Sequence, residues 1–192
     1  MKTQDPKNRI NNFDEVALGL TEEEAIAEAK RCLNCKKAAC VGGCPVEINI
    51  PAFIQHISKG EFEEALAKIR EKNFLPAVCG RVCPQEDQCE KVCILAKKDK
   101  SIGIGDLERF AADWGIKKGV RVTGNGARVK ADKEKVAVIG SGPSGITCAG
   151  ELSKMGYDVT VFESLHKPGG VLTYGIRSSG CRKILFKTIS NM

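Results

Sequence analysis

The sequence predicts two different folds in one chain: an all-α part over residues 1–115 and the first βαβ unit of a Rossmann-like α/β domain over residues 135–176. Three observations predict this division. Amphipathic helical patterns run up to residue 115, and eight of the ten cysteines lie between Cys32 and Cys93. Two short apolar runs then flank a glycine-rich turn. Residues 116–134 are basic and glycine-rich, which is typical of a linker.

The composition is that of an ordinary globular protein, with 192 residues, 42% hydrophobic and 28% charged. The net charge is +6, but no dense basic run interleaves with aromatic residues, so no nucleic-acid partner is expected. The polar N-terminus lacks the apolar segment of a signal peptide, and no window approaches the length of a membrane span. We therefore expect a cytoplasmic protein that is not associated with a membrane.

Capping signals place the helices of the first part. Thr21 and Glu24 form a capping box before residues 22–33, and Pro51 fits the first turn of a short helix. Residues 61–73 form an amphipathic helix. Asp106 is expected to cap a helix that stops at Gly115. Residues 1–12 are expected to be a flexible lead-in.

The cysteines of this part form two groups. The first follows the pattern C-x2-C-x4-C-x3-C-P. The second repeats the Cys-Pro feature, at Cys83-Pro84. Their members are Cys32, Cys35, Cys40 and Cys44, and Cys79, Cys83, Cys89 and Cys93.

Three explanations of this pattern are open: disulfides, zinc or iron–sulfur clusters. A reducing compartment disfavours disulfides, and structural zinc takes two well-separated ligand pairs rather than four ligands from one tight loop. A run of four cysteines followed by proline is typical of bacterial ferredoxins. The pattern favours two 4Fe–4S clusters. Eight thiols could supply two sets of four, although a cluster iron also accepts a ligand that is not a thiolate.

The turn of the βαβ unit has the pattern of a dinucleotide site. Gly140, Gly142 and Gly145 follow a predicted strand and open a predicted helix, where backbone N–H groups can bind a pyrophosphate. Glu163 closes the second strand, 18 residues after Gly145, and is placed to bind the ribose hydroxyls. FAD and NAD both fit this pattern. Cys148, inside the helix, is expected to be a small buried residue.

Four stretches resemble the NADPH-dependent glutamate synthase small chain family over roughly residues 9–176. Its relatives include the N-terminal part of dihydropyrimidine dehydrogenase, sulfide dehydrogenase and the large subunit of ferredoxin:NADP transhydrogenases. The stretches are RCLNCKKAACVGGCPVEINIPAFI, LPAVCGRVCPQEDQCE, IGIGDLERFAADW and KVAVIGSGPSGITCAGELSKMGYDVTVFE.

The resemblance implies a ligand set that differs from the simplest one. It places Cys32, Cys35, Cys40 and Cys93 on one cluster and Cys44, Cys83, Cys89 and Glu108 on the other, with Cys79 as a non-ligand. It also implies that the dinucleotide is FAD. The implied FAD residues are Gly140, Ser141, Gly142, Pro143, Ser144, Gly145, Glu163, Gly169 and Gly170.

The function implied by the resemblance is electron transfer. In the full-length family member, NADPH reduces FAD, and electrons pass through the clusters to a large glutamate synthase-type subunit or another flavoprotein acceptor. No side chain is expected to be a catalytic acid, base or nucleophile. A sulfide dehydrogenase or transhydrogenase subunit, a stand-alone ferredoxin-like relay and a zinc-stabilised interaction domain stay as alternatives, and an oligomer is compatible with all of them.

The resemblance ends at Ile176. The family continues YGIPEFRLPK, whereas this chain reads YGIRSSGCRK and carries no acidic residue after Glu163. Deleting one base from a suitable set of codons for PEFRLPK yields RSSGCRK, the sequence of residues 177–183. We therefore hypothesise that residues 177–192 are out of frame. One βαβ unit cannot form a sheet covered on both faces, so weak FAD retention is expected.

Overall fold

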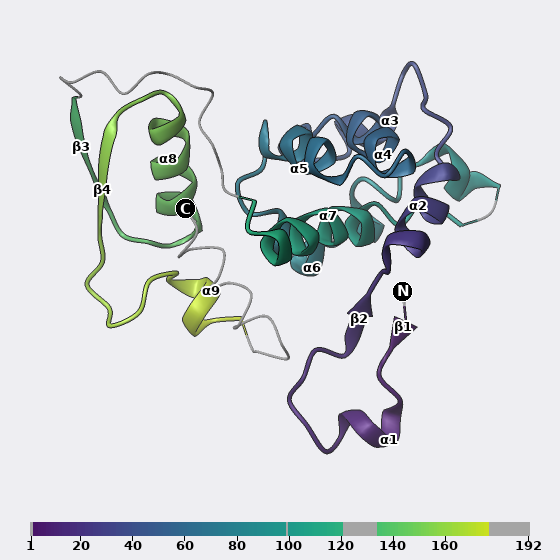
Figure 1. The fold of residues 1–192 in the computed structure, drawn as a ribbon, viewed down its shortest axis with the longest axis horizontal. Coiled ribbons are helices and arrows are strands. Elements are labelled where there is room, and N and C mark those ends of the chain that lie inside the picture. The colour runs from purple at the N-terminus through teal and green to yellow at the C-terminus, as the bar shows by residue number, and fades with distance from the viewer. Residues whose placement is uncertain (1, 99, 121–133, 177–192) are drawn as a thin grey trace. The chain divides into compact units, whose positions relative to one another are not determined.

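The computed structural model describes residues 2–98, 100–120 and 134–176 (Figure 1). The chain divides into two units, Met1–Val120 and Arg121–Met192, and each is described by itself. Most of the predicted linker, residues 121–133, and the whole predicted tail with Cys181 lie outside the described residues. The functional boundaries at residues 115, 134 and 176 stay a prediction.

The first unit is mainly helical. Its described elements are β1 (Lys2–Thr3), α1 (Pro6–Arg9), β2 (Ala17–Gly19), α2 (Glu22–Lys30), α3 (Ala39–Gly42), α4 (Ile50–Ser58), α5 (Phe62–Arg70), α6 (Pro76–Val82), the 3-10 helices η1 (Gln85–Asp87) and η2 (Ile94–Lys97), and α7 (Ile104–Lys118).

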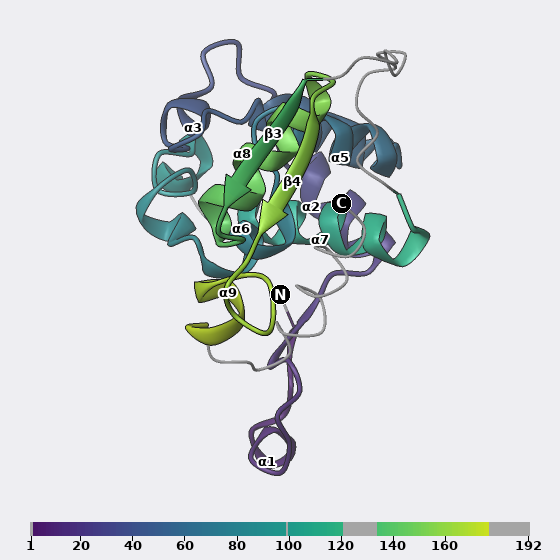
Figure 2. The same ribbon diagram turned by 90° about the vertical axis from the view of Figure 1, so that its left-hand side faces the viewer.

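The lead-in expected to be flexible is part of a hairpin, so that expectation was wrong. β1 pairs with β2 in antiparallel fashion, and α1 lies in the connection between them. Figures 1 and 2 show this hairpin projecting from the helices. Polar contacts fix it: the Asn12 side chain donates to Gln4 Oε1 at 3.1 Å, and Gln4 N–H donates to the Val16 carbonyl at 2.8 Å.

The predicted caps of the first helices are confirmed. Thr21 and Glu24 exchange both bonds of the capping box at 3.2 and 3.0 Å. Helix α2 ends at Lys30, so Cys32 lies in the turn just after the helix. Pro51 lies in the first turn of α4.

Helices α4, α5 and α7 enclose the core of the first unit. The predicted apolar stripe of α5 is buried, and Phe62 packs edge-on against Phe110 with ring centroids 5.1 Å apart. The largest fully buried side chains are Phe53, Ile54, Ile57, Leu66, Ile69, Ile102 and Leu107.

Helix α7 is longer than predicted at both ends. It begins at Ile104 rather than after Asp106, and it continues three residues past Gly115 to Lys118. Gly115 is a packing position, because a Cβ there would overlap the side chain of Leu66. The residue that ends the helix is Gly119, whose left-handed backbone (φ +70°) favours glycine.

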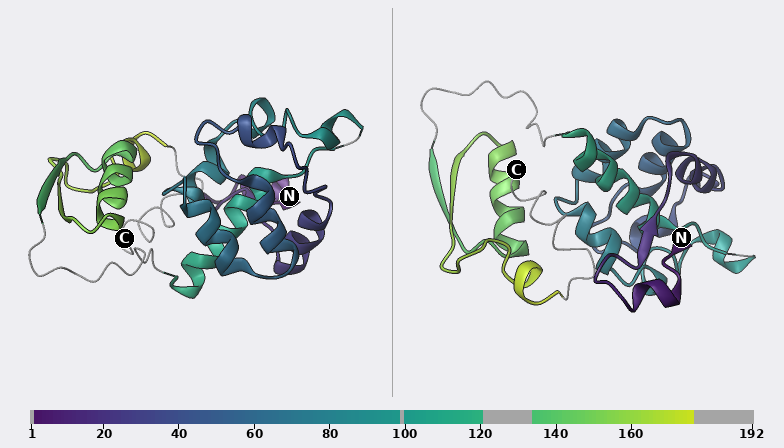
Figure 3. Two further views of the ribbon diagram at one scale, coloured as in Figure 1. Left: turned by 90° about the horizontal axis from the view of Figure 1, so that it is seen from above. Right: turned by 60° about the horizontal axis from the view of Figure 1, so that its bottom comes forward.

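The second unit is the predicted βαβ unit. Strands β3 (Lys135–Ile139) and β4 (Asp158–Phe162) are parallel neighbours, joined through α8 (Pro143–Lys154) and followed by α9 (Val171–Tyr174). Figure 2 shows the two strands side by side, and both views of Figure 3 show α8 alongside them.

Only one face of this two-stranded sheet is covered by described residues. Val138 and Ile146 are buried between the strands and α8. On the other face Ile139 is 81% exposed and its neighbour in the register, Phe162, is 53% exposed. Cys148 is exposed, so the expectation of a buried cysteine was wrong: it lies two positions after the buried Ile146, about half a turn around α8, and faces away from the strands.

Candidate iron–sulfur centres and nucleotide loop

Four cysteines line one hollow in the helical unit. The hollow is small, with a cavity volume of about 30 Å³, and it is partly open to solvent. Its sulfur-bearing residues come from the turn after α2, the start of α3 and the segment before η2, and its other walls are apolar side chains such as Ile54 and Ile104. The four are Cys32, Cys35, Cys40 and Cys93.

The thiols of this first group affect one another electrostatically. Burial raises the pKa of Cys40 to about 11, and the charges of Cys32 and Cys93 add to that rise. Burial also raises the pKa of Cys32, with further contributions from Cys35 and Cys93. Thiolates in such a group require positive charge among them, which iron ions supply.

The loop between the first two cysteines is shaped by a left-handed residue. Asn34 has φ +46°, a conformation that asparagine tolerates better than most residues. The backbone N–H of Asn34 hydrogen-bonds the Cys32 sulfur. Bonds of this kind to ligand sulfurs are a means by which proteins set cluster potentials.

A second group forms where α6 packs on α7. Gly80 allows the close approach, because a Cβ there would lie 2.7 Å from the Arg109 backbone nitrogen. Burial raises the pKa of Cys89 to about 12, and the charges of Glu90, Cys44 and Glu108 act in the same direction. The Cys79 side chain lowers the pKa of Cys83, whereas the charges of Glu108, Cys89 and Cys44 act to raise it. These mutual effects place Cys44, Cys79, Cys83, Cys89 and Glu108 in one neighbourhood, the second group.

Gly43 brings the first cysteine loop against the second. A Cβ at Gly43 would lie 2.6 Å from the Val92 side chain and 3.2 Å from Cys89 Cα. The next residue, Cys44, thereby joins the second group, although it belongs to the first group in the sequence.

Glu108 is a buried carboxylate in the middle of α7, with 7% exposure. Burial raises its pKa to about 8, and the charge of Cys79 contributes. Asn73 donates from Nδ2 to Glu108 Oε1 at 2.7 Å. Asn73 is a residue that sequence reasoning missed, because it lies 35 positions from Glu108 and no motif marks it.

In the structure Cys93 lines the same hollow as Cys32, Cys35 and Cys40; the division of the ligands between two clusters stays a prediction. Among the described residues, no three His, Cys, Asp or Glu side chains converge as the ligands of a single metal ion would. That these groups bind iron stays a prediction.

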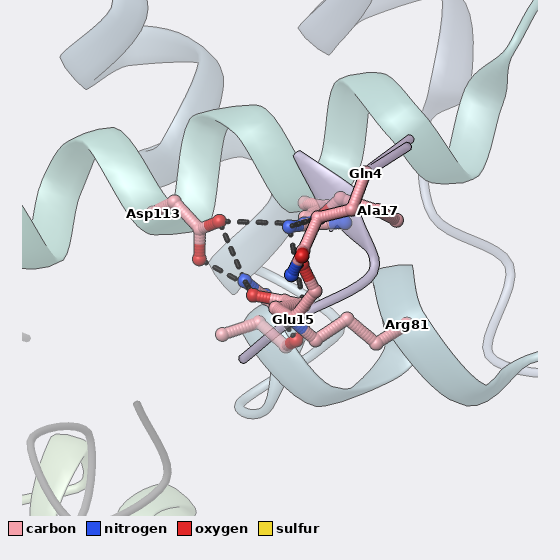
Figure 4. A network of polar contacts seen from close by, with 7 residues as sticks. Gln4, Glu15, Ala17, Arg81 and Asp113 are labelled. Carbon is pink, nitrogen blue, oxygen red and sulfur yellow. Dashed lines mark hydrogen bonds and ion pairs between the residues drawn. The ribbon is translucent and has the colours of Figure 1, made fainter. Parts of the chain in front are cut away.

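A buried ion-pair network fixes α6 and α7 beside the second group (Figure 4). Arg81 donates to both oxygens of Asp113 at 2.9 and 2.7 Å and to Glu15 Oε1 at 2.6 Å. Arg109 donates to the Ala17 carbonyl at 2.9 Å and pairs with Glu15 at 3.1 Å. The network joins the N-terminal hairpin to α6, which carries Cys79 and ends just before Cys83, and to α7, which carries Glu108.

The predicted nucleotide loop is folded as a strand–turn–helix. Gly140 has φ +94°, and Gly142 caps α8 with Pro143 in the first turn. A Cβ at Gly145 would overlap the Gly140 carbonyl oxygen, so glycine is required there for the helix to approach the strand. Gly169 and Gly170 reach the same loop, since Gly169 N–H donates to Ser141 Oγ at 2.9 Å.

Glu163 organises this loop. Its Oε2 accepts bonds from the Ser141 N–H (3.0 Å) and the Ser141 hydroxyl, and its Oε1 accepts the Leu165 N–H at 2.9 Å. The hydrogen bonds with Ser141, and then those from the backbone, lower the Glu163 pKa to about 2. Sequence reasoning assigned Glu163 to a ribose; that role stays a prediction, and the structure adds a role within the protein.

Both histidines of the chain have polar partners within the protein. His56 Nδ1 lies 2.7 Å from Glu61, and His166 Nδ1 lies 3.1 Å from the Tyr174 hydroxyl. Within the ranges described, no helix combines the length and apolar character that crossing a membrane requires.

The fold and its sulfur groups define a class of protein: a helical iron–sulfur unit followed by a Rossmann-like nucleotide-binding segment. The chain belongs to the family described as dihydropyrimidine dehydrogenase domain II, 4Fe-4S cluster, whose model matches residues 9–120. Residues 138–183 match the NAD(P)-binding Rossmann-like domain.

The curated relatives that the chain matches are oxidoreductases or subunits of them. It is 40% identical over 166 residues to the NAD-dependent dihydropyrimidine dehydrogenase subunit PreT of Salmonella typhimurium. It is 39% identical over 170 residues to the glutamate synthase (NADPH) small chain and 39% identical over 169 residues to the putative oxidoreductase UacF, both of Escherichia coli.

These alignments cover most of this chain and a minor part of each relative. They span 86%, 88% and 88% of this chain, but 40%, 36% and 26% of PreT, the glutamate synthase small chain and UacF respectively. The chain thus corresponds to less than half the length of the relatives it matches.

Proposed function

We propose that this chain is the cluster-bearing part of an electron-transfer oxidoreductase subunit. The observation that carries the proposal is the presence of two groups of cysteines on one helical unit, one lining a hollow and the other accompanied by the buried Glu108. The family match to a 4Fe-4S domain supports it independently. When bound, such clusters accept and release single electrons.

The proposed ligands follow the structural groups. Cys32, Cys35, Cys40 and Cys93 bind the first cluster, and Cys44, Cys83, Cys89 and Glu108 bind the second. The protein's contribution is to hold these donors apart in two sets, to exclude water from them and to direct N–H groups such as that of Asn34 at sulfur.

A flavin is the proposed ligand of the second unit. The glycine turn at Gly140–Gly145 presents backbone N–H groups to a pyrophosphate, and Gly169–Gly170 closes over the same loop. The bare face of the β3–β4 sheet supports the expectation of weak FAD retention.

A glutamate synthase-type role, with a large subunit as electron acceptor, is the specific function we propose. The sequence identity is 40% to PreT and 39% to the glutamate synthase small chain. Because these values are nearly equal, a dihydropyrimidine dehydrogenase-type subunit is the second candidate. Pull-down from the source cells with the anaerobic protein, followed by identification of the bound subunit, separates the two.

The test of electron transfer is optical. Anaerobically purified protein should absorb broadly in the blue, and dithionite should bleach that absorption, whereas NADPH alone should not. Adding an oxidised one-electron acceptor should restore the colour. The variant Cys35→Ser should lose about half the signal, since one of two clusters is lost, and Cys148→Ser is the matched control. Protein without a bleachable band contradicts the proposal.

A further inference from the structure

The second donor group contains five candidate ligands for a four-iron cluster. Besides Cys44, Cys83, Cys89 and Glu108, it includes the thiol of Cys79. The charge of that thiol contributes to the raised pKa of Glu108. Each iron of a four-iron cluster takes one protein ligand. Some feature of the protein must therefore decide whether Glu108 or Cys79 occupies the fourth position.

Asn73 contacts both competitors. It is buried, with 8% exposure, in the loop between α5 and α6. Its Nδ2 donates to Glu108 Oε1 at 2.7 Å, and its Oδ1 accepts the Cys79 S–H at an S···O distance of 3.6 Å.

The orientation of the Asn73 amide is fixed by a third contact. Oδ1 also accepts the Leu75 backbone N–H at 2.9 Å. A backbone N–H can only donate, so the amide oxygen must face Leu75 and the amide nitrogen must face Glu108. The donor side therefore always meets the carboxylate, and the acceptor side always meets the thiol.

The two contacts have opposite consequences for metal binding. A donated N–H holds the carboxylate in place through Oε1, and within the described residues Oε2 takes no hydrogen bond, so it can face an iron. The acceptor side holds the Cys79 sulfur at Oδ1, so an iron could bind Cys79 only if this contact were broken.

We propose that Asn73 is a positioning residue that selects Glu108 over Cys79 as the fourth ligand of the second cluster and keeps Cys79 as a reserve ligand. This inference rests on the proposed function. If Glu108 is removed, the Cys79 proton passes to solvent and an Fe–S bond to Cys79 replaces the Fe–O bond to Glu108. The exchange involves no oxidation or reduction.

The test uses the full chain, purified anaerobically, with iron content and the EPR spectrum of the dithionite-reduced protein as readouts. Wild-type protein should hold about eight iron atoms, and Cys79→Ser should match it in iron and in spectrum. Glu108→Ala should keep about eight iron atoms with an altered spectrum, and the double variant E108A/C79S should fall to about four.

The selecting role of Asn73 is tested by Asn73→Ser. Serine can still accept the Leu75 N–H through a local turn, but it is too short to reach Glu108 and Cys79. We expect N73S to keep its iron and to show the spectrum of E108A. The double variant N73S/C79S should return to the wild-type spectrum, because only Glu108 is then available.

The outcomes separate the two levels of the argument. Wild-type protein without iron overturns the proposed function itself. If wild-type protein holds about eight iron atoms, any of three results overturns this inference and leaves the proposed function standing. These results are a changed spectrum in C79S, loss of a cluster in E108A alone, and a wild-type spectrum in N73S. If N73S loses iron and the double variant N73S/C79S loses the same amount, Asn73 supports the fold and does not select the ligand.

Discussion

Replacing Arg81 with methionine should destabilise the helical unit and release the second cluster before the first. The Arg81 side chain is 6% exposed and lies on α6 between Cys79 and Cys83. Methionine fills a similar volume but removes the bonds to Asp113, Glu15 and the Ala77 carbonyl. Among the described residues, Arg109 is then the one cation that still pairs with both Glu15 and Asp113.

The magnitude follows from burial. Breaking a buried ion pair by removing one partner costs about 3–5 kcal/mol. Glu15 and Asp113 are 23% and 20% exposed, so water reaches them in part, and we expect the lower end, about 3 kcal/mol. For a unit of this size that corresponds to a fall in the apparent melting temperature of about 10 °C.

The assay is anaerobic thermal unfolding followed by circular dichroism, with iron measured on the same sample. Iron should fall from about eight toward about four atoms per chain. Lys68→Met is the control: Lys68 pairs with Glu71 at 2.6 Å, but both are partly exposed, so the loss should be below about 0.5 kcal/mol. If Arg81→Met unfolds like Lys68→Met and keeps its iron, the reasoning is refuted.

Three further predictions test other parts of the structure. Gly145→Ala should destabilise the βαβ unit by about 1–3 kcal/mol in hydrogen exchange, whereas Gly142→Ala, where nothing lies within 4 Å of the added Cβ, should have a smaller effect; equal effects would contradict the packing argument. Leu66→Ala, at a fully buried position, should cost about 3–5 kcal/mol, against a near-zero effect for the exposed Leu18→Ala in the same melt. Because Glu163 has a folded-state pKa of about 2, below its ordinary value of 4.5, its contribution to loop order is complete above about pH 4.5 and is lost as the pH falls toward 2; amide NMR should show this for wild type, with no such transition in Glu163→Gln.

Local signals in the sequence predicted the elements that depend on neighbouring residues. The Thr21–Glu24 capping box, Pro51 in the first turn of its helix and the glycine turn at Gly140–Gly145 all act over a few positions. The elements that were mispredicted depend on distant residues. The N-terminal hairpin is fixed by the bond from Arg81 to Glu15, 66 positions away.

The same reason explains the errors within the site. Gly115 looks like a helix stop in the sequence, but it is a contact point for Leu66, which only the packing of α5 on α7 reveals. Asn73 has no sequence signal because its partners come from α6 and α7. The cysteine spacing predicted thiol ligands for clusters. Which cysteines of the two loops lie together depends on the close packing at Gly43 and Gly80.

The most direct test of the account is the content of iron, acid-labile sulfide, zinc and flavin in one anaerobically purified sample. The account predicts about eight iron and eight sulfide per chain, no stoichiometric zinc and little flavin. Colourless protein that contains zinc and no sulfide would contradict the two cluster sites and the electron-transfer function built on them.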